Sequence, residues 1–129
     1  MISDGQAVAT LAASDMDRAR TFYEQTLGFS VVQETPMGLL FRGGKGTGFF
    51  VYPSEFAGTN KATAISINVD DLEATVGDLR SKGISFLEFD YPGFEMKDGI
   101  AHTPEGPGAW FTDPDGNIIS IAQMPSLGF

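Results

Sequence analysis

The chain has 129 residues, no cysteine, and 17 acidic against eight basic side chains, which gives a formal net charge of −9 at pH 7. Nucleic acid and anionic membranes are therefore disfavoured as partners, and no apolar run approaches the ~20 residues that span a bilayer. The length suffices for one domain with a hydrophobic core, and the absence of cysteine and of a cationic, apolar leader favours a reducing cytoplasm.

The N-terminal half of the chain predicts a strand, a helix and three further strands. Gln6–Ala13 is short and mostly apolar, as expected of a strand. Ser14 and Asp17 form a capping-box-like pair, and apolar residues then recur at helical spacing, so a helix is expected over about Asp15–Leu27, with Gly28 ending it. Three β-rich runs separated by turn residues follow: Phe29–Thr35, Gly38–Arg42 and Gly48–Tyr52.

The same order of elements then begins again. Thr63–Val69 alternates between apolar and small or polar residues, and a second helix is expected to start at Asp70 with Glu73 and to end at Gly83. Asp70 lies 56 positions after Ser14, and the same offset aligns the strands before the helices. We therefore expect one domain over residues 1–129, built from two βαβββ modules at about 5–54 and 62–124.

A hairpin is predicted near the C-terminus, where Asp113-Pro114-Asp115-Gly116-Asn117 separates the apolar runs Ala109–Thr112 and Ile118–Ala122. In its second arm Ile119 and Ile121 share one face and Ser120 lies on the other. The isoleucine face is expected to cover a helix, and the Ser120 face to line a cavity. The long connection Asp90–Pro107 is expected to lie across the mouth of that cavity.

Three segments carry a resemblance to a known family: Asp15–Phe29, Val69–Gly83 and Phe111–Ile121. In this order the chain resembles the vicinal oxygen chelate superfamily, which includes glyoxalase I, bleomycin-resistance proteins and extradiol dioxygenases. The resemblance implies an α+β fold in which two βαβββ modules form an open, incomplete barrel around a cavity. It also implies a small-molecule ligand and a homodimer.

The metal site of the superfamily does not carry over to this sequence. The resemblance implies His, Gln or Glu ligands on the first and last strands of each module. The matching positions here hold Val8, Phe50 or its neighbour Val51, Ala64 and Ser120. None of these offers the imidazole, carboxylate or thiolate that divalent cations prefer. We therefore expect no metal ligands, no cofactor and no inherited catalytic residues.

The candidate site is consequently a set of binding residues. Trp110 alternates with Phe111 and is expected to face the cavity, while His102, the sole histidine, is either a solvated loop residue or part of an improvised metal or general-base site. Arg42, Thr10 and Asn68 are candidates for orienting polar contacts. The predicted ligand-binding residues are Val8, Phe50, Tyr52, Ala64, Ser66, Phe94, Met96, His102, Trp110 and Ser120.

The leading hypothesis is a cytoplasmic, metal-independent protein that binds a drug or secondary metabolite, as the bleomycin-resistance branch does. One alternative is a lyase, isomerase or dioxygenase of the same superfamily with unorthodox metal ligands. Metal analysis and turnover of a methylglyoxal–glutathione adduct or of catechols would separate these two. A second alternative is a regulatory or partner-binding module, for which a protein partner would be found and no ligand.

Overall fold

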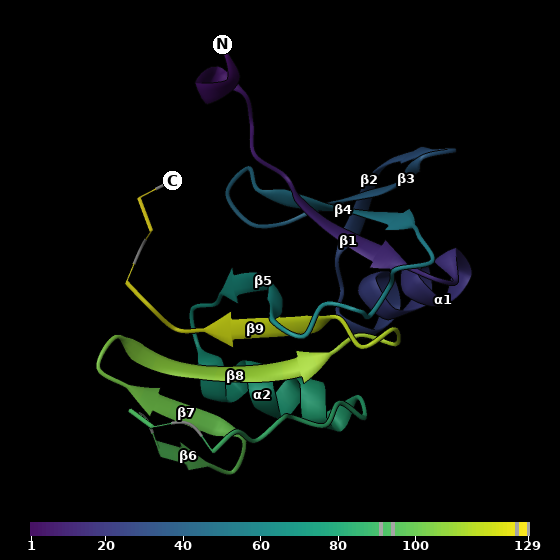
Figure 1. Ribbon diagram of the computed structural model, residues 1–129. Coiled ribbons are helices and arrows are strands. Elements are labelled where there is room, and N and C mark those ends of the chain that lie inside the picture. Colours follow the sequence, from purple (N-terminus) through teal and green to yellow (C-terminus); the bar gives the residue numbers. More distant parts are fainter. Residues whose placement is uncertain (91, 94, 126, 129) are drawn as a thin grey trace. The chain divides into compact units, whose positions relative to one another are not determined.

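Each half of the chain folds around one β-sheet in the computed structural model, which describes residues 1–90, 92–93, 95–125 and 127–128 (Figure 1). The chain divides into a first unit, Met1–Gly58, and a second unit, Thr59–Phe129. Each predicted module lies within one of these units. In the described residues no helix is long and apolar enough to cross a membrane.

The first unit has a four-stranded sheet in the order β1-β4-β3-β2. A short 3₁₀ turn, η1 (Ile2–Asp4), precedes β1. β1 (Ala9–Ala13) runs parallel to β4 (Gly48–Pro53), while β2 (Ser30–Thr35) and β3 (Gly38–Arg42) add antiparallel neighbours. The core is aromatic, because the buried ring of Tyr23 lies 5.6 Å from that of Phe41 and 5.4 Å from that of Phe49.

The predicted first helix forms with two differences. It starts as α1 (Met16–Arg20) and continues as a π-helical segment, η2 (Thr21–Thr26), before Gly28 ends it at φ +86°. Its N-cap is Asp15, whose side chain accepts the Arg18 N–H, rather than Ser14. The wider π-helical turn is visible in the bond from the Leu27 N–H to the Phe22 carbonyl, five residues back.

The second unit has a five-stranded sheet in the order β5-β9-β8-β7-β6. β5 (Thr63–Asn68) runs parallel to β9 (Ile118–Ala122), which pairs with β8 (Gly106–Thr112) through the predicted hairpin. Asp113 closes the turn by accepting the backbone N–H groups of Asp115 and Asn117. Helix α2 (Leu72–Ser81) begins at an Asp71 N-cap, one residue after the predicted start.

The structure corrects the expected Asp90–Pro107 connection. Residues 95–103 form a hairpin of two strands, β6 (Glu95–Lys97) and β7 (Ile100–Thr103), which extends the sheet beyond β8. Its tip needs left-handed backbone at Asp98 and Gly99, with φ +53° and +77°. The second module therefore has one strand more than the predicted βαβββ unit.

One face of the second sheet is buried, as predicted for the face that covers the helix. Phe111, Ile119 and Ile121 are almost completely buried, as are the α2 residues Leu72, Val76 and Leu79 that form the apolar stripe of the helix. On the opposite face Ser66, Ser120 and Trp110 stand in one cross-strand row, because Ser66 pairs with Ser120 and Ser120 with Trp110. This second face carries the candidate site.

Candidate functional site

A hollow of about 590 Å³ lies on the second unit. Its volume falls within the ~300–1,000 Å³ typical of pockets for small organic ligands. Side chains from β5, β8, β9, the turn before β5 and the segment after α2 meet there. The lining residues are Lys61, Ala62, Thr63, Glu88, Phe89, Asp90, Trp110 and Ile118.

Two aromatic side chains form one wall of this hollow. The rings of Phe89 and Trp110 meet edge to face, with centroids 5.4 Å apart and an interplanar angle of 87°. Phe89 is 39% exposed and Trp110 is half-buried, so both present ring surface that a ligand can cover. The Trp110 indole Nε1–H donates to the Thr63 hydroxyl at 3.3 Å, which orients the indole across β9 towards β5. The pair offers a ligand two ring surfaces that stand nearly at right angles to each other.

Phe89 belongs to a stretch that we call the edge segment, Leu87–Asp90, which lies alongside β8. The Leu87 N–H donates to the Trp110 carbonyl at 2.8 Å. From the other side, the β6–β7 hairpin supplies the Met96 sulfur, which accepts the Phe89 N–H at 3.0 Å, and the Gly99 N–H, which donates to Glu88 Oε1 at 3.2 Å. The edge segment is thus held between β8 and the hairpin, and these bonds place Phe89 and Glu88.

Helix α2 supports the same hairpin. The Arg80 guanidinium donates to the Asp98 carbonyl at the hairpin tip and lies 5.4 Å from the centre of the Phe86 ring. Phe86 in turn packs edge-on against the buried Phe111, with ring centroids 5.7 Å apart. The hairpin tip is therefore connected through Arg80 and Phe86 to the core of the second unit.

The second unit holds most of the predicted site residues. Trp110 lines the hollow, and Ser66 and Ser120 stand beside it in the same row of the sheet. Met96 contacts the edge segment rather than the hollow. Ala64 is half-buried at an irregularity of the β5–β9 pairing. Phe94 lies outside the described residues.

His102 does not line the hollow. It is exposed on β7, where it pairs with Glu95 on β6 and with Pro107 on β8. In the described part of the chain, no three His, Cys, Asp or Glu side chains gather as a metal site would require. The structure therefore assembles no metal centre around His102 from these residues.

Three predicted site residues lie in the first unit. Val8 is exposed and immediately precedes β1, while Phe50 and Tyr52 project from the same face of β4. Their rings stack almost in parallel, with an interplanar angle of 9° and centroids 6.4 Å apart. The structure thus brings Phe50 and Tyr52 together within this unit.

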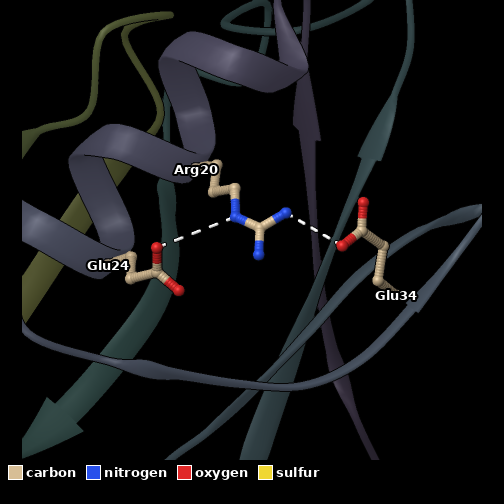
Figure 2. A network of polar contacts seen from close by, with 3 residues as sticks. All are labelled: Arg20, Glu24 and Glu34. Atoms are coloured by element: carbon tan, nitrogen blue, oxygen red, sulfur yellow. Dashed lines mark hydrogen bonds and ion pairs between the residues drawn. The ribbon is translucent and has the colours of Figure 1, made fainter.

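The first unit also has a hollow, of about 130 Å³, between α1 and the β2–β3 hairpin. The cation among its lining residues is already paired: Arg20 donates to Glu34 Oε1 at 2.9 Å and lies 3.7 Å from Glu24 Oε1 (Figure 2). The hydrogen bond to Glu34, and then the charge of that carboxylate, raise the pKa of Arg20. This hollow is small for an organic ligand and its cation is already paired, so the larger hollow is the better candidate.

The positions that match the metal ligands of the superfamily do not suit a divalent cation. Val8 and Phe50 are apolar, Ala64 has only a methyl group, and Ser120 is a buried hydroxyl that stands between Ser66 and Trp110. A neutral hydroxyl is a weak ligand compared with imidazole, carboxylate or thiolate. The donor set of this chain therefore does not fit the metal.

Sequence reasoning missed seven of the residues that line the larger hollow, most of them in the edge segment and the turn before β5. Of these residues, Phe89 is the one that the sequence could most readily have indicated. It belongs to a mostly apolar stretch, with Phe86 and Leu87, just before the long connection. Lys61 lies outside the predicted elements, and Thr63 is predicted only as the first residue of a strand. They reach the hollow because β5 pairs with β9, so that Thr63 lies beside Ile118.

The fold closely matches several solved structures. A bleomycin resistance determinant encoded on the transposon Tn5 has a TM-score of 0.72 and 22% identity, covering 95% of this chain and 99% of that one. A bleomycin-binding protein complexed with bleomycin has a TM-score of 0.71 and 22% identity, covering 94% and 99%. The antibiotic-binding protein TnmS3 from Streptomyces sp. CB03234 has a TM-score of 0.67 and 23% identity, covering 94% and 98%. These likenesses confirm the predicted α+β fold class.

Comparison with curated proteins finds no match to the chain. A family model described as the Glyoxalase/Bleomycin resistance protein/Dioxygenase superfamily matches residues 5–121, which is most of the sequence. The match includes all three segments on which the resemblance was based. The chain therefore belongs to the Glyoxalase/Bleomycin resistance protein/Dioxygenase superfamily.

Proposed function

We propose that this protein binds an aromatic small molecule, without a metal ion, in the hollow of the second unit. The observation that carries the proposal is the edge-to-face pair of Phe89 and Trp110, which forms a partly exposed wall of a hollow of about 590 Å³. Partly exposed aromatic surface in a concave site favours ligands with flat apolar groups. Solved relatives described as bleomycin-binding and antibiotic-binding proteins support binding over turnover.

The proposal that binding needs no metal rests on the side chains at the positions that correspond to metal ligands. Glyoxalase-like or dioxygenase-like catalysis needs a Lewis acid, and the four positions that correspond to metal ligands hold Val8, Phe50 or Val51, Ala64 and Ser120. Without those metal ligands, the site can still bind a small molecule and shield it from water. We further propose that the protein acts as a cytoplasmic homodimer that sequesters a drug or secondary metabolite.

Titration of the protein with aromatic compounds tests this function, because Trp110 is the sole tryptophan and its emission reports on the hollow directly. A ligand stacked on the indole should shift or quench that emission. Calorimetry with Trp110→Ala should then show weaker binding, while Trp110→Phe, which keeps a flat ring, should retain most of it. Phe56→Leu, an exposed aromatic of the first unit, serves as the control.

Two results would contradict the proposal. One is a set of binders that all leave the Trp110 emission unchanged and bind Trp110→Ala as tightly as the original protein. The other is turnover of a methylglyoxal–glutathione adduct or of a catechol that depends on bound metal, because this result would favour the enzyme alternative.

A further inference from the structure

The hollow of the second unit carries both signs of charge, on opposite sides of its aromatic wall. Lys61 lies in the turn before β5, whereas Glu88 and Asp90 lie in the edge segment beside β8. Within the part of the chain that the structure describes, no ion pair joins Lys61 to either carboxylate. Unlike Arg20 in the first unit, these three groups are not neutralised by one another, although one oxygen of the Glu88 carboxylate accepts the Gly99 N–H.

The sheet keeps the two charged sides apart. From β5 the order across the sheet is β9 and then β8, and the edge segment follows, joined to β8 through the Leu87–Trp110 backbone bond. The backbones of β5 and of the edge segment at Leu87 are thus about three spacings of ~4.8 Å apart, or about 14 Å, and Lys61 precedes β5 while Glu88 and Asp90 follow Leu87. An ion pair needs its charged atoms within about 4 Å, so strand geometry opposes direct pairing.

Local hydrogen bonds place the charged residues on each side. The turn that carries Lys61 is closed by the Asn60 side-chain oxygen, which accepts the Ala62 N–H at 3.0 Å. On the other side, the Gly99 N–H holds one oxygen of the Glu88 carboxylate. Glu88 is therefore the better fixed of the two acids, and Asp90 adds negative charge beside it.

We propose that the hollow selects an elongated aromatic zwitterion, whose anionic end meets Lys61 and whose cationic end meets Glu88 and Asp90. This inference rests on the proposed function and names the class of ligand. Because the two rings are nearly perpendicular, the flat middle of such a molecule stacks on Trp110, and its cationic end meets the Phe89 ring in a cation–π contact. A ligand with one charge satisfies only one side of the hollow.

Four biphenyl compounds test the inference, because they share one aromatic core and differ only in charge. The zwitterion is 4′-(aminomethyl)biphenyl-4-carboxylate, which carries its two charges at opposite ends. The matched compounds are 4-(aminomethyl)biphenyl, biphenyl-4-carboxylate and the neutral biphenyl-4-carboxamide. Each is titrated against the full chain by Trp110 emission, at low and at high salt.

The zwitterion should bind up to about fivefold more tightly than either singly charged compound, which is the upper range for an exposed ion pair. Added salt should reduce this preference, because exposed charges are screened. Lys61→Gln should weaken binding of the zwitterion and the anion and leave the cation unaffected. Glu88→Gln should weaken binding of the zwitterion and the cation and leave the anion unaffected.

Two variants control for the change in net charge: Lys45→Gln and Glu55→Gln, both exposed residues of the first unit. Each should bind all four compounds as the original protein does. Equal affinity for the four compounds, or equal effects of Lys61→Gln and Lys45→Gln, would overturn the zwitterion inference and leave the proposed function standing. If none of the four changes the Trp110 emission or gives heat in calorimetry, both the inference and the proposed function fail.

Discussion

The N-cap of α2 is Asp71, one residue after the helix start that the sequence predicts. Two consecutive aspartates, Asp70 and Asp71, both precede α2, and each is followed by an acidic or small residue three positions later. In the structure the Asp71 carboxylate accepts the Ala74 N–H at 3.1 Å, and its carbonyl accepts the Thr75 hydroxyl. The capping-box spacing favours Asp70, because Glu73 lies three residues after it, whereas Asp71 caps the helix through its own carboxylate without a glutamate at the third position.

This difference gives the first prediction. Asp71→Ala should lower the free energy of unfolding by about 1 kcal/mol, the usual cost of a lost N-cap, and Asp70→Ala should change it by less than about 0.5 kcal/mol. Both variants remove one negative charge, so each controls for the other. Urea denaturation measures the two values. A larger loss for Asp70→Ala would restore the cap expected from the sequence and contradict the structure.

The sequence predicts a residue of the candidate site only where that residue lies on a strand with a recognisable alternation. Trp110 was expected to face away from the helix side because it alternates with Phe111, and the row it forms with Ser120 and Ser66 has that arrangement. Phe89 and Lys61 were not predicted. Their places depend on partners distant in the chain: Phe89 contacts Met96 and the Trp110 ring, and Lys61 precedes β5, which pairs with β9.

At the scale of elements, regular spacing predicted most strands and both helices, and irregular backbone accounts for the differences. The π-helical turns of η2 keep Tyr23 buried against Phe41 and Phe49, yet they have the same apolar spacing in the sequence as an ordinary helix. β6 and β7 are only three and four residues long, which is too short for alternation to identify either as a strand. Their formation depends on the edge that β8 provides.

Helix α2 provides the second prediction through its internal glycine. Gly77 is exposed in the middle of the helix, and a Cβ added there would meet nothing within 4 Å. Gly77→Ala should therefore raise the free energy of unfolding by roughly 0.8–1.0 kcal/mol, because alanine loses less backbone freedom on folding. Thermal and urea denaturation measure this gain.

Gly83 is the matched control for Gly77. It also has open space around the position of a Cβ, but its φ of +90° is one that L-residues rarely adopt. Gly83→Ala should consequently destabilise the protein by about 1–2 kcal/mol. Similar effects of the two substitutions would mean that α2 does not end at a left-handed Gly83.

For the whole molecule, the third prediction concerns metal content. The purified protein should contain no stoichiometric divalent metal, because Val8, Phe50 or Val51, Ala64 and Ser120 supply no strong ligand at the corresponding positions. Elemental analysis before and after treatment with a chelator measures this. Near one equivalent of zinc, iron, manganese or nickel, removed by the chelator together with an activity, would reject the metal-independent function.

The fourth prediction concerns assembly. The edge strands are β1 and β2 in the first sheet and β5 and β6 in the second, and edge strands are the ones through which a sheet can pair with another chain. Exposed apolar side chains, among them Val8 and Val32 on or beside these strands, add surface that association would bury. We therefore expect a homodimer, and sedimentation at tens of micromolar should give twice the mass of the chain.

Assembly and binding are nevertheless separable in this molecule. All the residues that line the larger hollow belong to the second unit of a single chain, so each chain should bind one molecule of the biphenyl zwitterion, whether the protein is a dimer or a monomer. Calorimetry gives this stoichiometry and sedimentation gives the mass. One bound molecule per two chains would place the site at a shared interface instead, whereas a monomer with one bound molecule would refute the dimer and leave the hollow as the binding site.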